Sequence, residues 1–227
     1  MTVCVAAITD NGKKLILAAD NMLTVSIGGT MQYEKEDAEH KKIYQLNSQT
    51  WALGAGTTNF IDSIIKEAKK DIGVNQKPVN VADRVKLSYQ KFYLGMAEDS
   101  VLKKHGLNWD AFNKDQKNLD PQTVKSINDE LNGIKPDVLI IVAGYSKEDN
   151  NECYLGTVGG YTLVDRTIEG FCTVGNGGDF AKYSLLLSDY SKTLPLEKAE
   201  ELVKKAIKDA ARSPGVGQLG DYFVVPK

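Results

Sequence analysis

The chain is poor in the residues that build metal sites and disulfide frameworks. Its 227 residues include only three cysteines and two histidines. The cysteines, Cys4, Cys153 and Cys172, lie far apart in apolar stretches, where a free cysteine behaves as a small hydrophobic residue. The histidines, His40 and His105, lie in polar stretches. These shortages argue against a disulfide framework, a zinc site and a Ser-His-Asp site.

An excess of charge and a long apolar run are also missing. The 28 Lys and Arg residues nearly balance the 30 Asp and Glu residues, so the charge gives no sign of a nucleic-acid or anionic-membrane partner. No apolar run approaches the roughly 20 residues that a membrane-spanning helix needs. The leading segment has no basic region before its apolar residues, so we expect no signal peptide and a cytoplasmic location.

The length and composition are those of an ordinary globular protein. Hydrophobic residues make up 42% of the chain and charged residues 26%, which supports a soluble protein with a substantial core. A length of 227 residues fits one large domain or two small ones. Because we find no internal repeat and no low-complexity linker, we expect a single domain over residues 1–227. A polar stretch at about 100–136 is interpreted as a surface elaboration.

The first twenty residues predict a β-hairpin. Residues 2–9 are small, β-branched and apolar, which is typical of a strand that is buried on both faces. The turn Asp10-Asn11-Gly12 follows, because Asn and Gly tolerate positive φ angles, and residues 13–20 return as a second strand. This geometry brings Thr2 and Asp20 toward the same end of the hairpin.

The remaining strands and helices come in blocks, which favours an α+β fold over alternating βαβ units. The apolar strands need cover on both faces, and two packed sheets with helices outside would supply it. The stretch 25–41 is interpreted as a polar connection. We expect strands at 42–46, 50–56, 137–144, 153–158, 162–165, 170–174 and 221–225, and helices that begin near Thr57 or Thr58, near Asn80, at Pro121, after the glycines of 175–178 and near Leu196.

Several residues near the leading end suggest nucleophilic chemistry. Removal of Met1 would place a hydroxyl and a free α-amine on Thr2, and an amine with a pKa near ~7.7–8.0 can serve as the base for that hydroxyl. Asp20 would orient the ammonium, and the charge of Lys42 would lower the pKa of the hydroxyl and the amine. The small residues that end at Gly56 would let a backbone N–H face a reacting carbonyl. Each residue alone has an ordinary structural explanation, and it is their combination that suggests a site.

Together these segments resemble the proteasome β-type family of N-terminal nucleophile (Ntn) hydrolases. The resemblance implies that Thr2 is the nucleophile, Asp20 the supporting acid, Lys42 the lysine and Gly56 the oxyanion glycine. Further along, Asn176 falls where the family has a serine that helps to poise the terminal amine. The matching pieces are Thr2-Val3-Cys4-Val5, Asp10-Asn11-Gly12, Leu17-Ala18-Ala19-Asp20, Thr24, Lys42-Ile43-Tyr44-Gln45-Leu46, Ala55-Gly56, Thr173-Val174-Gly175-Asn176-Gly177-Gly178 and the stretch 217–225.

The resemblance also implies a fold, an activity and an assembly. The implied fold is a four-layer α/β/β/α sandwich, and the implied activity is that of a threonine-type amide hydrolase or peptidase that needs no metal or organic cofactor. Its substrate would be a peptide or another amide, and copies of the chain would assemble into rings or stacked rings. Ser213 and Val216 fall where the family commonly has an aspartate and a serine, so the surroundings of the site differ from the family pattern.

Other interpretations remain open at this point. The altered surroundings are compatible with a catalytically silent assembly subunit. The same threonine could transfer an acyl group to an amine instead of to water. The glycines of 175–178 could bind a phosphate at a helix start, and Cys4 could be a nucleophile if three residues were trimmed. The last two hypotheses have less support, because the Lys of a P-loop is missing and Cys4 lies in a strand pattern.

Overall fold

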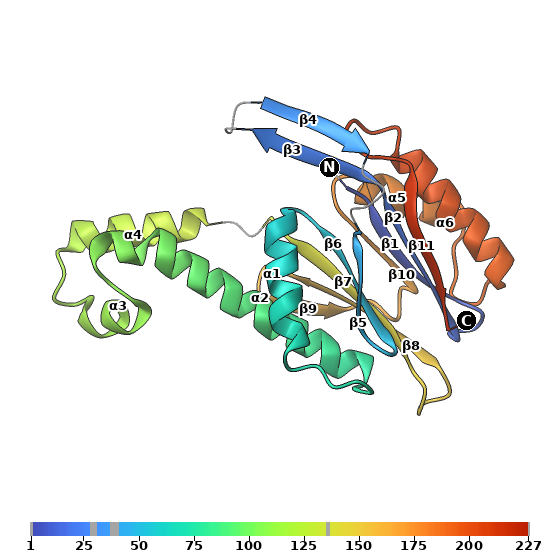
Figure 1. Cartoon of the computed structure of the whole chain (residues 1–227), viewed down its shortest axis with the longest axis horizontal. Coiled ribbons are helices and arrows are strands. Elements are labelled where there is room, and N and C mark those ends of the chain that lie inside the picture. Colours follow the sequence, from blue (N-terminus) through green and yellow to red (C-terminus); the bar gives the residue numbers. More distant parts are fainter. Residues whose placement is uncertain (1, 28–30, 37–40, 135–136, 227) are drawn as a thin grey trace.

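Two antiparallel sheets form the middle of the molecule (Figure 1). The structure is a computed structural model, and it describes residues 2–27, 31–36, 41–134 and 137–226. The first sheet has the strand order β10 (Phe171–Val174), β1 (Cys4–Thr9), β2 (Lys14–Asp20) and β11 (Leu219–Val225). The second sheet has the order β5 (Ile43–Asn47), β6 (Thr50–Ala55), β7 (Leu139–Ser146), β8 (Glu152–Gly159) and β9 (Thr162–Asp165).

The apolar sequence of β1 serves two cores at once. Cys4, Ala6 and Ile8 belong to a core shared by strands of both sheets. The alternate residues Val5 and Ala7 pack in a second core with two helices. Because successive side chains of a strand point to opposite faces, an uninterrupted apolar strand is what a sheet covered on both faces requires.

Helices cover the faces of the sheets that point away from each other (Figure 1). The helices α5 (Gly178–Leu187) and α6 (Leu196–Ala210) pack on the first sheet. The helices α1 (Thr58–Lys69) and α2 (Pro78–Ser100) pack on the second sheet. The expected α+β class is therefore confirmed, with strands and helices in blocks along the chain.

The stretch between the first hairpin and β5 contains two strands that we did not expect. We interpreted residues 25–41 as a connection, but the structure forms a hairpin of β3 (Met22–Ile27) and β4 (Met31–Glu36). Residues 28–30 and 37–40 lie outside the described part of the chain. The hairpin lies beside the first sheet at the end where the chain begins (Figure 1).

The surface elaboration is helical and projects to one side of the sheets (Figure 1). It consists of the 3-10 turn η1 (Leu102–His105), α3 (Trp109–Asp115) and α4 (Pro121–Gly133). A small apolar cluster around Leu102, Phe112 and Ile127 holds these pieces together. The helix expected at Pro121 is present, whereas α3 is short and its sequence did not predict it. None of the helices in the described ranges is both long enough and apolar enough to cross a membrane.

The core between the sheets gives a first test of the packing. Ile141 in β7 is fully buried there, so the change Ile141→Ala should lower the free energy of unfolding by about 2–5 kcal/mol. The matched control is Leu187→Ala, at a side chain that is 85% exposed, with an expected change within about 0.5 kcal/mol. Urea unfolding measures both, and similar losses in the two variants would contradict this packing.

Candidate active site

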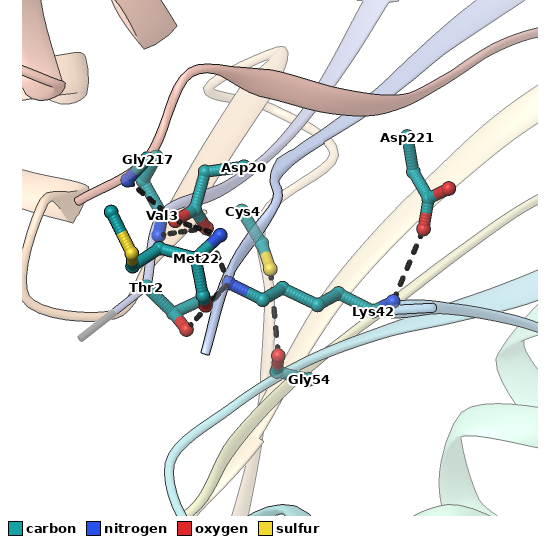
Figure 2. Close-up of polar contacts among 9 residues, drawn as sticks. All are labelled: Thr2, Val3, Cys4, Asp20, Met22, Lys42, Gly54, Gly217 and Asp221. Carbon is teal, nitrogen blue, oxygen red and sulfur yellow. Dashed lines mark hydrogen bonds and ion pairs between the residues drawn. The ribbon is translucent and has the colours of Figure 1, made fainter. Parts of the chain in front are cut away.

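The first hairpin places Thr2 next to Asp20. The pairing of β1 with β2 sets Cys4 opposite Ala19, so the residue before β1 meets the end of β2. The Asp20 main-chain N–H donates to the Val3 carbonyl at 3.1 Å, and the Val3 N–H donates to Asp20 Oδ1 at 2.9 Å. Thr2 directly precedes this contact, and Figure 2 shows it beside the carboxylate.

Lys42 reaches this pair from the other sheet (Figure 2). Its ammonium Nζ donates to Thr2 Oγ1 at 2.9 Å, to Asp20 Oδ1 at 2.6 Å and to the Met22 carbonyl at 2.6 Å. An ammonium has three N–H donors, so these three acceptors match its full capacity. Because Lys42 directly precedes β5, the contact joins the second sheet to the end of the first hairpin.

The Asp20 carboxylate is buried and accepts hydrogen bonds at both oxygens. Its side chain is 0% exposed and that of Lys42 is 5% exposed, so the ion pair is shielded from water. Oδ1 accepts from Val3 N–H and Lys42 Nζ, and Oδ2 accepts from the N–H groups of Met22 at 3.2 Å and Gly217 at 2.9 Å. A buried charge needs such partners to offset its lost hydration. The fold therefore holds this carboxylate in one place.

A glycine loop fixes the backbone of Thr2. The Gly177 N–H donates to the Thr2 carbonyl at 3.1 Å. Gly175 has a φ of +94°, and a Cβ at that position would lie 2.2 Å from the Thr2 carbonyl oxygen and 3.3 Å from the Cβ of Ala55. Asn176 lies between these glycines, with its side chain exposed. The loop thus brings the backbone around Asn176 to Thr2, and among the described residues the exposed Asn176 amide has no hydrogen-bond partner that would define its role.

Gly56 follows Ala55 and has a constrained backbone. Its φ is +117°, and a Cβ there would lie 2.0 Å from the carbonyl oxygen of Asp137. Its neighbour Thr57 donates its hydroxyl to Asp137 Oδ2 at 2.5 Å. Since Ala55 borders the Gly175 loop, Gly56 belongs to the same end of the molecule as Thr2. The oxyanion role of its N–H stays a prediction.

Sequence reasoning missed the backbone donors and one carboxylate. The Gly217 N–H on Asp20 comes from the loop before β11, and a backbone group carries no residue-type signature. Asp221 accepts the main-chain N–H of Lys42 at 3.1 Å. Val216, which falls where the sequence resemblance aligns a serine, is buried, and a Cβ at Gly177 would lie 2.9 Å from its Cγ2. An apolar side chain therefore fills this part of the site's surroundings.

The structure disfavours two of the open interpretations. Cys4 is fully buried, its thiol lies 3.5 Å from the Gly54 carbonyl, and burial raises the pKa of the thiol to about 12 although the Lys42 charge opposes the shift. Such a thiol is a packing group. The N–H groups of Gly177 and Gly178 already donate to backbone carbonyls, which leaves them unavailable to a phosphate. Within the described residues, no cluster of three or more His, Cys, Asp or Glu side chains is placed to hold a metal ion.

The Gly175 contact predicts a matched pair of glycine variants. Gly175→Ala adds a methyl against the Thr2 carbonyl, whereas Gly12→Ala, at a φ of +86°, adds one with no described atom within 4 Å. Gly12→Ala should cost only the left-handed backbone strain of roughly 1–2 kcal/mol. Gly175→Ala should cost clearly more in the free energy of unfolding, because the Thr2 backbone must also move. Equal losses in urea unfolding would show that the loop does not press on Thr2.

Comparison with solved structures identifies a similar fold over nearly the whole chain. The crystal structure of eukaryotic HslV from Trypanosoma brucei matches with a TM-score of 0.55 and 15% sequence identity, covering 98% of each chain. No family model matches the sequence, and no curated protein sequence does. At this identity the likeness shows the fold alone. It supports the proteasome-type fold that the sequence resemblance implied, but not any one member of that fold family.

Proposed function

We propose that the protein is a threonine-type N-terminal nucleophile hydrolase that cleaves peptide or other amide bonds. The observation that carries the proposal is the buried Lys42 ammonium, which contacts both Thr2 Oγ1 and Asp20 Oδ1. The HslV-like fold also favours a proteasome-like threonine protease. The proposal requires that Thr2 is the first residue of the mature chain, so that Met1 and anything before it have been removed.

The nucleophile of the proposed reaction is the Thr2 hydroxyl. Its Oγ attacks the carbonyl carbon of the scissile amide, and its proton passes to the α-amine of Thr2. The Lys42 ammonium, 2.9 Å from that oxygen, stabilises the negative charge that develops on it. Asp20 holds the ammonium in place and offsets its charge. No metal or organic cofactor takes part in this scheme.

The remaining steps follow from the same groups. The Gly56 N–H donates to the oxyanion of the tetrahedral intermediate. The protonated amine gives its proton to the leaving nitrogen, the C–N bond breaks, and an ester forms on Thr2. Water then attacks the ester with the amine again as the base, the bond between the acyl carbon and Thr2 Oγ breaks, and the amine returns the proton to that oxygen as the acid product leaves. Asn176 would act beside the terminal amine, at the position where the family uses a serine.

The proposal includes the finer architecture and an assembly. The two facing sheets with helices on their outer faces support the four-layer α/β/β/α sandwich of the Ntn type. The HslV-like fold also favours assembly of copies of this chain into a ring or stacked rings, which would confine the site. Analytical ultracentrifugation of the purified protein would show whether such an assembly forms.

A catalytically silent assembly subunit is the second candidate. The buried Val216, packed where the family has a serine, is the observation that favours it. The two candidates share a fold and differ in whether Thr2 ever carries an acyl group. Turnover therefore separates them.

The change Thr2→Ala removes the nucleophile and should lower kcat/KM on a library of fluorogenic peptide amides by about 10³-fold or more. Thr2→Ser keeps a hydroxyl and an amine on one residue, so it should retain measurable turnover. The matched control is Thr162→Ala, at an exposed threonine of β9, which should leave turnover unchanged.

Three outcomes would change this assignment. Full activity in Thr2→Ala would place the chemistry elsewhere. Absence of turnover and of any acyl adduct in the wild type would favour the silent subunit. Products that carry an added amine, identified by mass spectrometry, would show acyl transfer in place of hydrolysis.

A further inference from the structure

The hydrogen bonding of Lys42 departs from the regular pattern at the start of β5. In a hydrogen-bonded antiparallel pair, two opposite residues exchange both of their N–H···O bonds. The Gly54 N–H does donate to the Lys42 carbonyl at 3.2 Å. The Lys42 N–H instead donates to Asp221 Oδ2 at 3.1 Å, and the Gly54 carbonyl is contacted by the Cys4 thiol. Lys42 therefore makes only one of the two main-chain hydrogen bonds that a regular pairing with Gly54 would give it.

Asp221 belongs to the first sheet. An irregularity in β11 changes the direction of its side chain. The pairing of β11 with β2 shifts between Leu219 and Tyr222, so Gly220 and Asp221 lie in the shifted segment. Such bulges redirect a side chain out of the regular ladder. A Cβ at Gly220 would lie 2.8 Å from the Cβ of Asn21, so a glycine here allows β11 to pack closely against the residue that follows Asp20.

Both ends of Lys42 are thus held by the first sheet (Figure 2). Asp20, at the end of β2, binds the ammonium, and Asp221, on β11, binds the main-chain N–H. β5 is an edge strand of the second sheet, so within the described residues no further strand pairs with its outer side. The Lys42 side chain is therefore held at its backbone and at its ammonium, so it loses much of its conformational freedom before a substrate binds.

We propose that Asp221 is a positioning residue that holds the Lys42 backbone so that its ammonium reaches Thr2 Oγ1. The role depends on the proposed function, because it acts through Lys42. A hydrogen bond to an ionised acceptor is roughly twice as strong as a neutral one. Loss of the acceptor would free the start of β5 from the first sheet and displace the ammonium from the nucleophile.

The experiment compares three variants of the full chain. Asp221→Ala removes the acceptor, and Asp221→Asn keeps an acceptor oxygen of the same shape without the charge. The matched control is Asp165→Ala, in which the lost carboxylate accepts the Thr167 N–H at 2.8 Å on β9, the other edge strand of the second sheet. We measure kcat and KM on the fluorogenic amides, the free energy of unfolding, and the crystal structure of Asp221→Ala.

A displacement of about 1 Å in catalytic geometry can cost about 10²-fold in rate, so Asp221→Ala should lower kcat by about that factor. Its KM should change little, because Lys42 acts on the nucleophile. Asp221→Asn should recover much of the loss, and Asp165→Ala should match the wild type. In the Asp221→Ala crystal structure, Nζ of Lys42 should lie beyond hydrogen-bond distance of Thr2 Oγ1.

The outcomes separate this inference from the proposed function. An unmoved Lys42 ammonium in Asp221→Ala, or an unchanged kcat in an active enzyme, overturns the positioning role and leaves the proposed function standing. A loss that tracks only the free energy of unfolding and is not recovered in Asp221→Asn also overturns it. An inactive wild type overturns the proposed function, and the crystal structure then still decides whether Asp221 places Lys42.

Discussion

The contact of the Lys42 ammonium with Thr2 and Asp20 is the interaction on which the site depends. It joins two sheets that share a largely apolar core. A buried cation and a buried carboxylate are costly to remove from water unless each is fully hydrogen-bonded. Here Asp20 accepts three backbone N–H groups as well as the ammonium. The pair is therefore held in a fixed arrangement, as catalysis by preorganised charge requires.

The fold supplies this arrangement through segments that lie far apart in the sequence. The first hairpin brings Thr2 to Asp20, and the glycine loop before α5 holds the Thr2 carbonyl. Gly56 directly follows β6, and its backbone packs closely against Asp137. Small residues recur at these points because backbone segments approach one another closely there. The site thus lies where strand ends from both sheets come together. Close packing of the backbone constrains the residue types at these ends.

The sequence predicts contacts between neighbouring segments better than contacts between segments that lie far apart in the chain. The turn at Asp10-Asn11-Gly12 and the apolar strands on either side of it are enough to place Thr2 near Asp20. Lys42 and Gly56 gave only weak local signals, and the family resemblance joined them to the site, since no local pattern says that a strand of the second sheet reaches the first hairpin. Gly217 contacts Asp20 through its backbone N–H, so its residue type could not reveal this contact. The hairpin of β3 and β4 was missed although Leu23, Val25 and Ile27 alternate with Thr24 and Ser26, because the residues that follow, including β4, are mainly polar and charged.

The proposed function requires that this arrangement activates a threonine at the very start of the mature chain. The most direct test is the mass of the N-terminal peptide of the purified wild-type protein after reaction with a peptide β-lactone, which acylates activated hydroxyls. We expect a chain that begins at Thr2 and carries one acyl group on the Thr2 hydroxyl. A leading end that is extended or blocked, or an acyl group that forms only on other residues, would contradict it.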